Sequence, residues 1–273
     1  MPITIPLYQV DAFTDRVFAG NPAAVCPLGE WLPNETMQAV AAENNLSETA
    51  FFVARPDGDF DLRWFTPKVE VDLCGHATLA SGHVVLNHLE PTRDVVAFHT
   101  RSGRLTVARD GERLVMDFPS QPAERTDDAD LLADVADALG EAPSHLFASN
   151  TILAVFDHHS QVAGLKPDFA RMAALGSPYV IATAPGDGEG VDFVSRFFAP
   201  TAGIDEDPVT GSAHTVLMPY WVERLGRNEL VARQISDRGG TLWCKLKGDR
   251  VSIAGHVADY MRGEITVRAP AAS

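Results

Sequence analysis

The chain of 273 residues is 45% hydrophobic and 22% charged, the composition of an ordinary globular protein with one large domain or two modest ones. Its formal net charge of -15 disfavours nucleic acid and anionic membranes as partners, because both would repel it and the sequence contains no basic patch. Three widely spaced cysteines exclude a disulfide framework, the first residues lack a signal pattern, and no apolar run reaches about 18 residues. We therefore expect a soluble cytoplasmic protein.

A single carboxylate opens the first informative strand. The segment from Asn45 to Val53 is NLSETAFFV, so Glu48 stands at the start of an otherwise apolar strand. Partial desolvation there favours the protonated carboxyl group and would suit Glu48 to taking and returning a proton. An exposed glutamate at a strand edge is the other interpretation of the same spacing. As a carboxylate with no counterpart in the second half of the chain, Glu48 is the best general acid/base candidate.

The segment DLCGHATLASG, from Asp72 to Gly82, places Cys74, Gly75 and His76 at the start of an expected helix. The first amides of a helix are unsatisfied and carry partial positive charge, and a glycine there lets an anion approach closely. A carboxylate would fit such a position, although Gly75 could merely turn the chain into the helix. Cys74 and His76 could also form a nucleophile and its base, which a spacing of two residues does not establish.

The second half of the chain repeats the order of these signals. Three segments of the first half have counterparts: RWFTP at 63–67 and RFFAP at 196–200, DLCGHA at 72–77 and DPVTGSA at 207–213, and the strand-turn-strand patterns at 102–118 and 239–255. In the last pair, the dipeptides Asp-Gly and Gly-Asp mark tight turns. Three correspondences in the same order predict two similar halves.

The boundary between the halves is expected near Pro119 to Pro122, before a helix from Asp128 to Leu139 that Gly140 stops. We predict domains at 1–119 and 120–273, with the last ~10 residues as a candidate strand that returns to the first domain. Strands occur in hairpins as well as around helices. That arrangement favours an α+β or mixed-sheet protein over a doubly wound parallel fold.

The second glycine-led helix start extends the anion hypothesis. If the two halves face one another, Gly75 and His76 on one side and Gly211 and Ser212 on the other would clamp a carboxylate in the cleft between them. Ser212 could instead be an ordinary helix cap. Asp207 could orient a polar group of the substrate or only cap its helix.

The remaining motifs point away from metal and two-thiol chemistry. Cys74 corresponds in position to Thr210, so a mechanism with one thiol on each face of the substrate lacks its second thiol. His76 and His83 are seven residues apart and His158 and His159 are adjacent, and neither pair joins a cysteine or carboxylate at typical metal-ligand spacing. We predict no metal.

Four segments together make the chain resemble the PhzF-like (phenazine biosynthesis) proteins, which share the diaminopimelate epimerase fold. The segments are YQVDAFTDRVFAGNPAAV, NLSETAFF, RWFTPKVEVDLCGHATLASG and RFFAPTAGIDEDPVTGSAH. The resemblance implies two similar α+β domains of the diaminopimelate epimerase type, each a mixed, barrel-like sheet around a central helix. It also implies an active site in the cleft between the domains, and a homodimer.

The resemblance assigns roles to individual residues and an activity to the chain. Glu48 would be the proton shuttle, and the substrate-binding groups would be Gly75, His76, Asp207, Gly211 and Ser212. The implied activity is a cofactor-independent isomerase of a small carboxylate-bearing metabolite. An epimerase or dehydratase that uses Cys74, with its thiol pKa lowered by the helix end, is one alternative. A non-catalytic metabolite-binding protein is the other.

Overall fold

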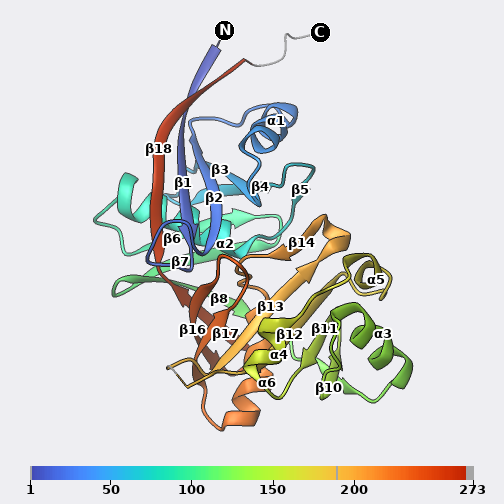
Figure 1. Cartoon of the computed structure of the whole chain (residues 1–273). Helices are drawn as coiled ribbons and strands as arrows, with labels where there is room; N and C mark the ends of the chain where they lie inside the picture. Colours follow the sequence, from blue (N-terminus) through green and yellow to red (C-terminus); the bar gives the residue numbers. More distant parts are fainter. Residues whose placement is uncertain (1, 189, 269–273) are drawn as a thin grey trace. The chain divides into compact units, whose positions relative to one another are not determined.

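The computed structural model describes residues 2–188 and 190–268 (Figure 1). It divides into two compact units, one containing the chain up to Asp117 and from Ala254 on, the other containing Phe118–Ile253. The regular structure is mostly strand and also contains α-helices, so the expected α+β class is confirmed. The division falls slightly before the expected boundary, and the returning segment begins earlier than expected. The last five residues of that segment lie outside the described residues.

In the first unit, short helices accompany a run of strands. The strands are β1 (Pro2–Ala12), β2 (Asn21–Leu28), β3 (Glu48–Ala54), β4 (Phe60–Phe65), β5 (Glu70–Val71), β6 (Val95–Thr100), β7 (Gly103–Asp110), β8 (Arg113–Pro119) and β18 (Val257–Arg268). The helices are α1 (Asn34–Asn44) and α2 (Gly75–His83), and a π-helical turn, η1 (Val84–Leu89), continues α2. Strand β1 lies antiparallel to both β18 and β2, as Figure 1 shows for β1 and β18.

The second unit has its own strands and four α-helices among the described residues. The strands are β9 (Glu124–Thr126), β10 (His145–Ala148), β11 (Thr151–Val155), β12 (Tyr179–Pro185), β13 (Phe193–Ala199), β14 (Ile204–Asp207), β15 (Glu229–Gln234), β16 (Gly240–Lys247) and β17 (Arg250–Gly255). The helices are α3 (Ala129–Leu139), α4 (His159–Gly164), α5 (Phe169–Ala173), the 3-10 turn η2 (Pro200–Ala202) and α6 (Ala213–Leu225).

The two units share one order of strand pairing. In the first, β1–β2 is antiparallel, β2–β3 parallel, β3–β4 antiparallel, β4–β6 parallel and β6–β7 antiparallel. In the second, β10–β11, β11–β12, β12–β13, β13–β15 and β15–β16 follow the same sequence of directions. The short strands β5 and β14 each lie antiparallel to the strand before them. The repeated signals of the sequence therefore correspond to repeated topology.

An arginine that pairs with a glutamate explains why the segments RWFTP and RFFAP recur. Arg63 on β4 holds Glu70 on β5 through two hydrogen bonds of 2.7 and 2.8 Å, and its guanidinium lies over Phe65. Arg196 on β13 holds Glu206 on β14 through two bonds of 2.7 Å and lies over Phe198 in the same way. Such bidentate pairs fix direction as well as distance. In each unit, the arginine secures the short strand that precedes a glycine-led helix.

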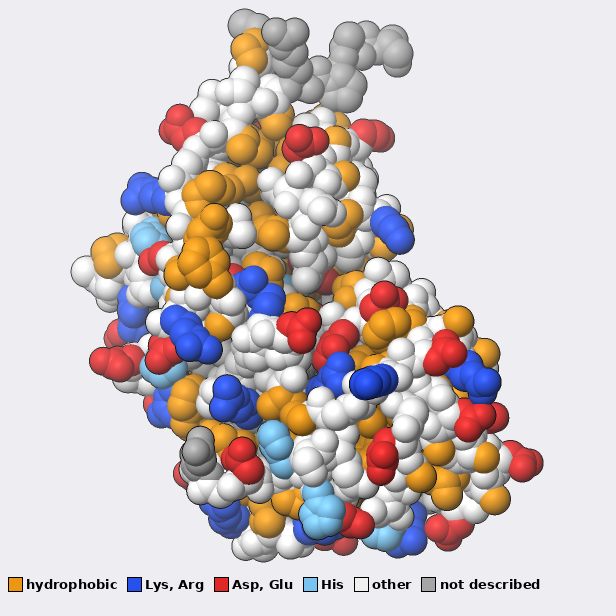
Figure 2. All heavy atoms as spheres, in the orientation of Figure 1, with side chains coloured by type: hydrophobic (Ala, Val, Ile, Leu, Met, Phe, Trp, Pro, Cys, Tyr) orange, Lys and Arg blue, Asp and Glu red, His pale blue; other side chains and the backbone are white. Residues whose placement is uncertain are grey.

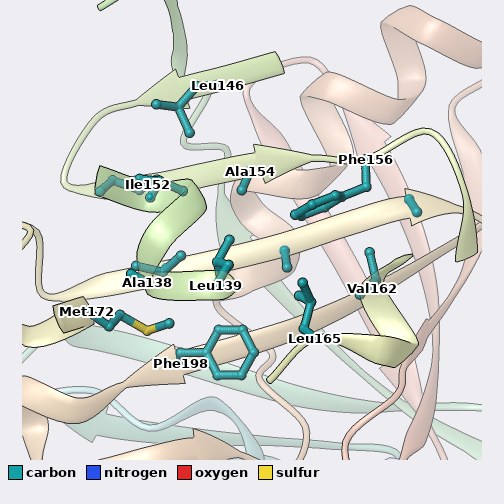
Figure 3. Packing of buried hydrophobic residues seen from close by; sticks show 14 of the residues in the cluster. Ala138, Leu139, Leu146, Ile152, Ala154, Phe156, Val162, Leu165, Met172 and Phe198 are labelled. Carbon is teal, nitrogen blue, oxygen red and sulfur yellow. The ribbon is translucent and has the colours of Figure 1, made fainter. Parts of the chain in front are cut away.

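The core of the second unit lies on both faces of β12 and β13. Alternate residues of these strands, including Ala182, Val194 and Phe198, pack against Leu139 of α3 and Met172 of α5 (Figure 3). The residues between them point to the opposite face, because successive side chains of a strand alternate. There, the indole nitrogen of Trp221 on α6 donates to Thr183, and its ring stacks on Phe193. Helix α6 thus covers the face that α3 and α5 leave open.

Helix α2 is the buried helix of the first unit. All of its residues from His76 to His83 are buried, and it contacts β1, β2, β3, β7 and β18. An added Cβ atom at Gly82 would lie 2.5 Å from Val107 Cγ1 on β7. Gly82 therefore allows α2 to approach β7 closely. This packing explains why a glycine stands inside the helix, where it lowers helix stability by about 1 kcal/mol relative to alanine.

Local signals place other element ends where the sequence predicts them. Asp128 accepts hydrogen bonds from the amides of Asp130 and Leu131 at the start of α3, and Gly140 ends this helix with φ 78°. The turns at Gly111 and Gly248 use φ 64° and 61°, which favour glycine. The predicted helix and both strand-turn-strand patterns are confirmed.

The described surface shows no large region of one charge on the face drawn in Figure 2, where acidic and basic side chains are interspersed. None of the helices within the described residues has both the length and the apolar character needed to cross a bilayer.

The close approach of α2 to β7 gives a first prediction. Gly82→Ala should destabilise the protein by about 1–3 kcal/mol through overpacking, although helix propensity alone would make it stabilising. Gly164→Ala, at the end of α4 with nothing within 4 Å of the added Cβ, is the matched control and should lack this penalty. Urea unfolding measures both. Because Val107 Cβ would itself lie 2.6 Å from the added Cβ, only Val107→Gly removes the whole contact. Adding Val107→Gly to Gly82→Ala should reduce the interaction penalty, and a strictly additive double variant would contradict the contact.

Candidate functional site

Strand alternation directs Glu48 toward α2. On β3, Phe51 belongs to the hydrophobic cluster that contains Met37 of α1, and Val53 packs against that cluster. Glu48 is offset from them by an odd number of positions, so its side chain points to the opposite face, where α2 lies. Glu48 is buried, and its predicted place at the start of an apolar strand is confirmed.

Asn21 reaches the same place from the neighbouring strand. On β2, Cys26 and Leu28 belong to the α1 cluster, so Asn21 faces the other way. Its side-chain amide lies 3.2 Å from His76 Nδ1, within hydrogen-bonding distance of the ring. Sequence reasoning did not select Asn21. Its only signal was its position within the GNP of the first segment that carries the family resemblance.

Glu48, Cys74 and His76 form one buried group around the imidazole ring. His76 Nε2 lies 3.1 Å from Glu48 Oε2, and Cys74 Sγ lies 3.5 Å from His76 Nδ1. The side chains of His76 and Glu48 are only 6% and 11% exposed. Although Nε2 and Oε2 are close, neither makes an aligned hydrogen bond within the described part of the chain. The two atoms face each other as a close, buried charge pair.

The electrostatics of this group favour a charged imidazole. Burial by itself would lower the pKa of His76, but the neighbouring Cys74 and Glu48 outweigh it and raise the pKa well above its ordinary value. We assign the attraction chiefly to Glu48, because a carboxylate beside a cation stabilises the charged ring. His76 and Glu48 then form a buried ion pair.

Cys74 is not an activated thiol. Burial, and next the charge of Glu48, raise the pKa of Cys74 to about 11. The expectation that the helix end lowers this pKa is wrong. Burial destabilises the thiolate by more than the positive end of the helix stabilises it. Near neutral pH the side chain is a protonated thiol and a poor nucleophile.

The same three side chains carry donor atoms of types that bind zinc, all lying within 4.8 Å of one another. A metal there would have to displace the proton of Cys74, which its raised pKa opposes. The expectation of no metal at this group stays a prediction.

Helix α2 starts at Gly75, as the sequence predicts. Its N-cap residue, Cys74, is extended with φ -145° and ψ 112° and provides no side-chain cap by hydrogen bond. The positive end of the helix thus lies at the histidine and the carboxylate of the buried group. This position suits a small anion, because the first amides and the imidazolium attract the same charge.

In the second unit, Asp207 anchors the corresponding loop. Asp207 ends β14, is buried and accepts a hydrogen bond from the Thr210 hydroxyl. Gln234 at the end of β15 donates to the Asp207 carbonyl at 2.7 Å and accepts from the Thr210 amide at 2.9 Å. The fully buried Gln234, which no sequence signal indicated, thereby fixes the loop that carries Asp207.

Gly211 and Ser212 follow this loop and lead into α6, which begins at Ala213. Ser212 is exposed, and its side chain does not cap α6, so the ordinary-cap interpretation does not describe it. The side chain of Asp207 accepts from Thr210 and is not the N-cap of α6 either. Helix α6 therefore starts two residues after Gly211, and the side chain of its N-cap residue, Ser212, makes no capping hydrogen bond.

His214 in the first turn of α6 gives a pH prediction. Its Nδ1 donates to the Thr210 carbonyl at 2.9 Å, and burial lowers its pKa to about 4. Unfolding restores the ordinary value near 6.5, so the unfolded state takes up a proton first as pH falls. The stability that His214 contributes is present above pH 6.5, and about 3 kcal/mol of it should be lost between pH 6.5 and 4.

Denaturant titrations across this pH range check the prediction. His214→Gln cannot titrate, so the stability difference between wild type and variant should shift toward the variant as pH falls. Parallel pH profiles for the two proteins would contradict the assignment.

Comparisons with known proteins find likeness over nearly the whole chain. A family model described as phenazine biosynthesis-like protein, PhzC-PhzF, matches residues 10–263. An uncharacterized isomerase of Pseudomonas aeruginosa is 51% identical, with 96% of this chain and 98% of that protein covered. The crystal structure of a PhzF family protein from Enterococcus faecalis has a TM-score of 0.92 at 44% identity and covers 96% of this chain and 99% of its own.

A more distant likeness concerns the fold alone. A hydroxyproline epimerase from Agrobacterium vitis has a TM-score of 0.60 at 13% identity, covering 97% of this chain and 93% of its own. The resemblance to the epimerase fold that the sequence segments indicate is thus confirmed at the level of structure.

Proposed function

The chain belongs to the PhzC-PhzF phenazine biosynthesis-like family and is an isomerase of that family, and we propose that it moves a proton within a small carboxylate-bearing metabolite through Glu48. The observation that carries the proposal is the buried Glu48 carboxylate, 3.1 Å from His76 Nε2 at the positive end of α2. A shift of hydrogen within one molecule requires only a group that takes a proton from one carbon and returns it to another. The proposed reaction therefore needs no cofactor.

In this mechanism, Glu48 accepts a proton from a substrate carbon and redelivers it from the same side. His76, held by Asn21 and charged by its neighbours, balances the negative charge that develops on the substrate when the proton leaves. Burial of the pair strengthens that interaction, because fewer water molecules screen it. The same burial shelters the transferred proton from solvent.

Substrate binding is proposed for the residues at the two helix starts. Gly75 and His76 would receive a carboxylate at the first amides of α2, and Gly211 and Ser212 would supply the corresponding groups before α6. Asp207, fixed by Thr210 and Gln234, would orient a polar group of the substrate. Support comes from the uncapped starts of both helices and from the place of these residues in the family motifs.

Three finer expectations belong to the same proposal. Each unit would be a mixed, barrel-like sheet around a central helix, which the contacts of α2 with five strands support for the first unit. From the family resemblance we also propose a homodimer, which light scattering after gel filtration would test. A cytoplasmic location is proposed from the composition and the unpaired cysteines.

One observation favours a second candidate, an epimerase or dehydratase that uses Cys74. Its sulfur lies 3.5 Å from His76 Nδ1, so a neutral ring with its proton on Nε2 could accept the thiol proton. The raised pKa of Cys74 opposes this role near neutral pH. We therefore rank it below Glu48, and the two assignments make opposite predictions for single variants.

Glu48→Gln should abolish turnover while leaving carboxylate binding nearly intact, because the amide keeps the shape of the side chain but cannot exchange a proton. The loss should reach or exceed about 10⁴-fold, the upper range for general acid/base catalysis. Cys74→Ser is the matched control in the same group and should retain most of the activity.

The measurement uses proton NMR on a panel of amino, hydroxy and aromatic carboxylic acids incubated with enzyme in deuterated water. New product resonances report turnover, and loss of carbon-bound proton signals reports exchange. Turnover decides, since a sheltered proton can return before it exchanges. Near-normal turnover by Glu48→Gln, combined with its loss in Cys74→Ser, would replace the proposal with thiol chemistry.

A further inference from the structure

A second cluster of ionisable side chains lies in the first unit, outside the group around Glu48. His83 Nε2 lies 3.1 Å from Asp259 Oδ1, and His88 Nε2 lies 2.9 Å from the same oxygen. The spacing of the histidines in the sequence predicts no metal, but the fold brings His88 and Asp259 to His83. We propose, against that prediction, that His83, His88 and Asp259 form a binding site for a late first-row divalent metal of the zinc class. Two imidazole nitrogens and one carboxylate oxygen are ligands that such ions prefer.

The π-helical turn after α2 brings the two histidines together. His83 is the last residue of α2, and His88 lies five residues later within η1. In an α-helix, residues five apart point about 140° away from each other, because each residue turns the helix by about 100°. A π-helical turn bonds each residue to the one five positions along and brings the two positions much closer in direction. Such turns often occur at functional sites.

Asp259 enters the cluster from the returning strand. On β18 it pairs with Val10 of β1, directly beside an irregularity in register between Gln9 and Val10. An irregularity of this kind re-aims the neighbouring side chains. The side chain of Asp259 is 52% exposed, whereas those of His83 and His88 are 8% and 21% exposed. The cluster is therefore built on a buried histidine and open on its carboxylate side, where a metal and its water ligands could enter.

The spacing of the donor atoms suits tetrahedral coordination. Zinc bonds nitrogen at about 2.0–2.1 Å and carboxylate oxygen at about 2.0–2.2 Å, so adjacent ligand atoms of a tetrahedral site lie roughly 3.3 Å apart. The separations of 3.1 and 2.9 Å are only slightly shorter. A small outward movement of the exposed carboxylate would admit the ion.

Asn87 controls the other nitrogen of His83. Its amide nitrogen donates to His83 Nδ1 at 2.9 Å, while its oxygen accepts from Arg109 at 2.8 Å. A metal on Nε2 places the ring proton on Nδ1, so Asn87 would have to rotate to accept it. Metal-bound histidines are commonly oriented by a carboxylate at this position, and such outer partners typically change affinity by about 10- to 100-fold. Asn87→Asp would provide that acceptor and keep a partner for Arg109.

Calorimetric titration of the full chain with Zn²⁺, with Mg²⁺ as the reference ion, tests the site. Wild type should bind one more zinc ion than Asp259→Asn, which keeps the size of the side chain and removes its charge. His88→Gln should lose the same ion, and circular dichroism verifies that both variants are folded. Among the described residues, the first unit holds two other groups of possible donor atoms, Glu48, Cys74 and His76 in one and Asp57, Asp59 and His99 in the other. Cys74→Ser and Asp57→Asn, one change in each, should leave the difference between wild type and Asp259→Asn in place.

Asn87→Asp should tighten zinc binding by about 10-fold, an effect that a purely structural hydrogen-bond network would not produce. Equal zinc stoichiometry and affinity in wild type, Asp259→Asn and His88→Gln would overturn the proposal, even if those variants lowered thermal stability. Binding of Mg²⁺ as tight as that of Zn²⁺ would overturn the assignment to the zinc class.

Discussion

The burial of helix α2 on nearly every side is the constraint on which the arrangement of the first unit depends. Strands contact it from several directions, and its residues from His76 on are enclosed. A helix buried in this way satisfies its backbone internally except at its ends. Polar side chains enclosed near its start must therefore find partners there, and Asn21, Glu48 and Cys74 surround His76 for that reason. The buried group around His76 therefore follows from the way the strands enclose α2.

Repetition of the strand order in the second unit places a corresponding loop before α6, but that loop has different contents. Asp207, Thr210 and Gln234 form a hydrogen-bonded frame there. His214 is buried in this unit as well, and its pKa falls because no charge compensates its burial. His76 has the opposite shift because Glu48 and Cys74 lie beside it. Equivalent strand orders therefore carry unlike side chains, and on this difference we base the proposal of proton transfer in the first unit.

The balance between desolvation and neighbouring charge separates the candidate roles within the first group. Burial acts on both His76 and Cys74 and disfavours their charged forms. The negative charge of Glu48 compensates the cation of His76 but opposes the anion of Cys74, so the two pKa values move toward a charged ring and a neutral thiol. Because of this asymmetry, we propose the carboxylate and the imidazole for the proton transfer and rank the thiol below them.

Local and repeated features were determined by the sequence alone. Turn glycines, the cap at Asp128, the strand that begins at Glu48 and the helix that begins at Gly75 follow from short-range chemistry, and the recurring arginine phrases indicated a repeated topology. Only the tertiary structure decided what lies beside each side chain. Asn21, Gln234 and the contact of Asp259 with His83 and His88 depend on strand register, on the alternation of side chains and on an irregular helical turn. His88 and Asp259 meet although they are 171 positions apart in the sequence. The direction of the pKa shift at Cys74 depends on burial by distant segments, which no local spacing encodes.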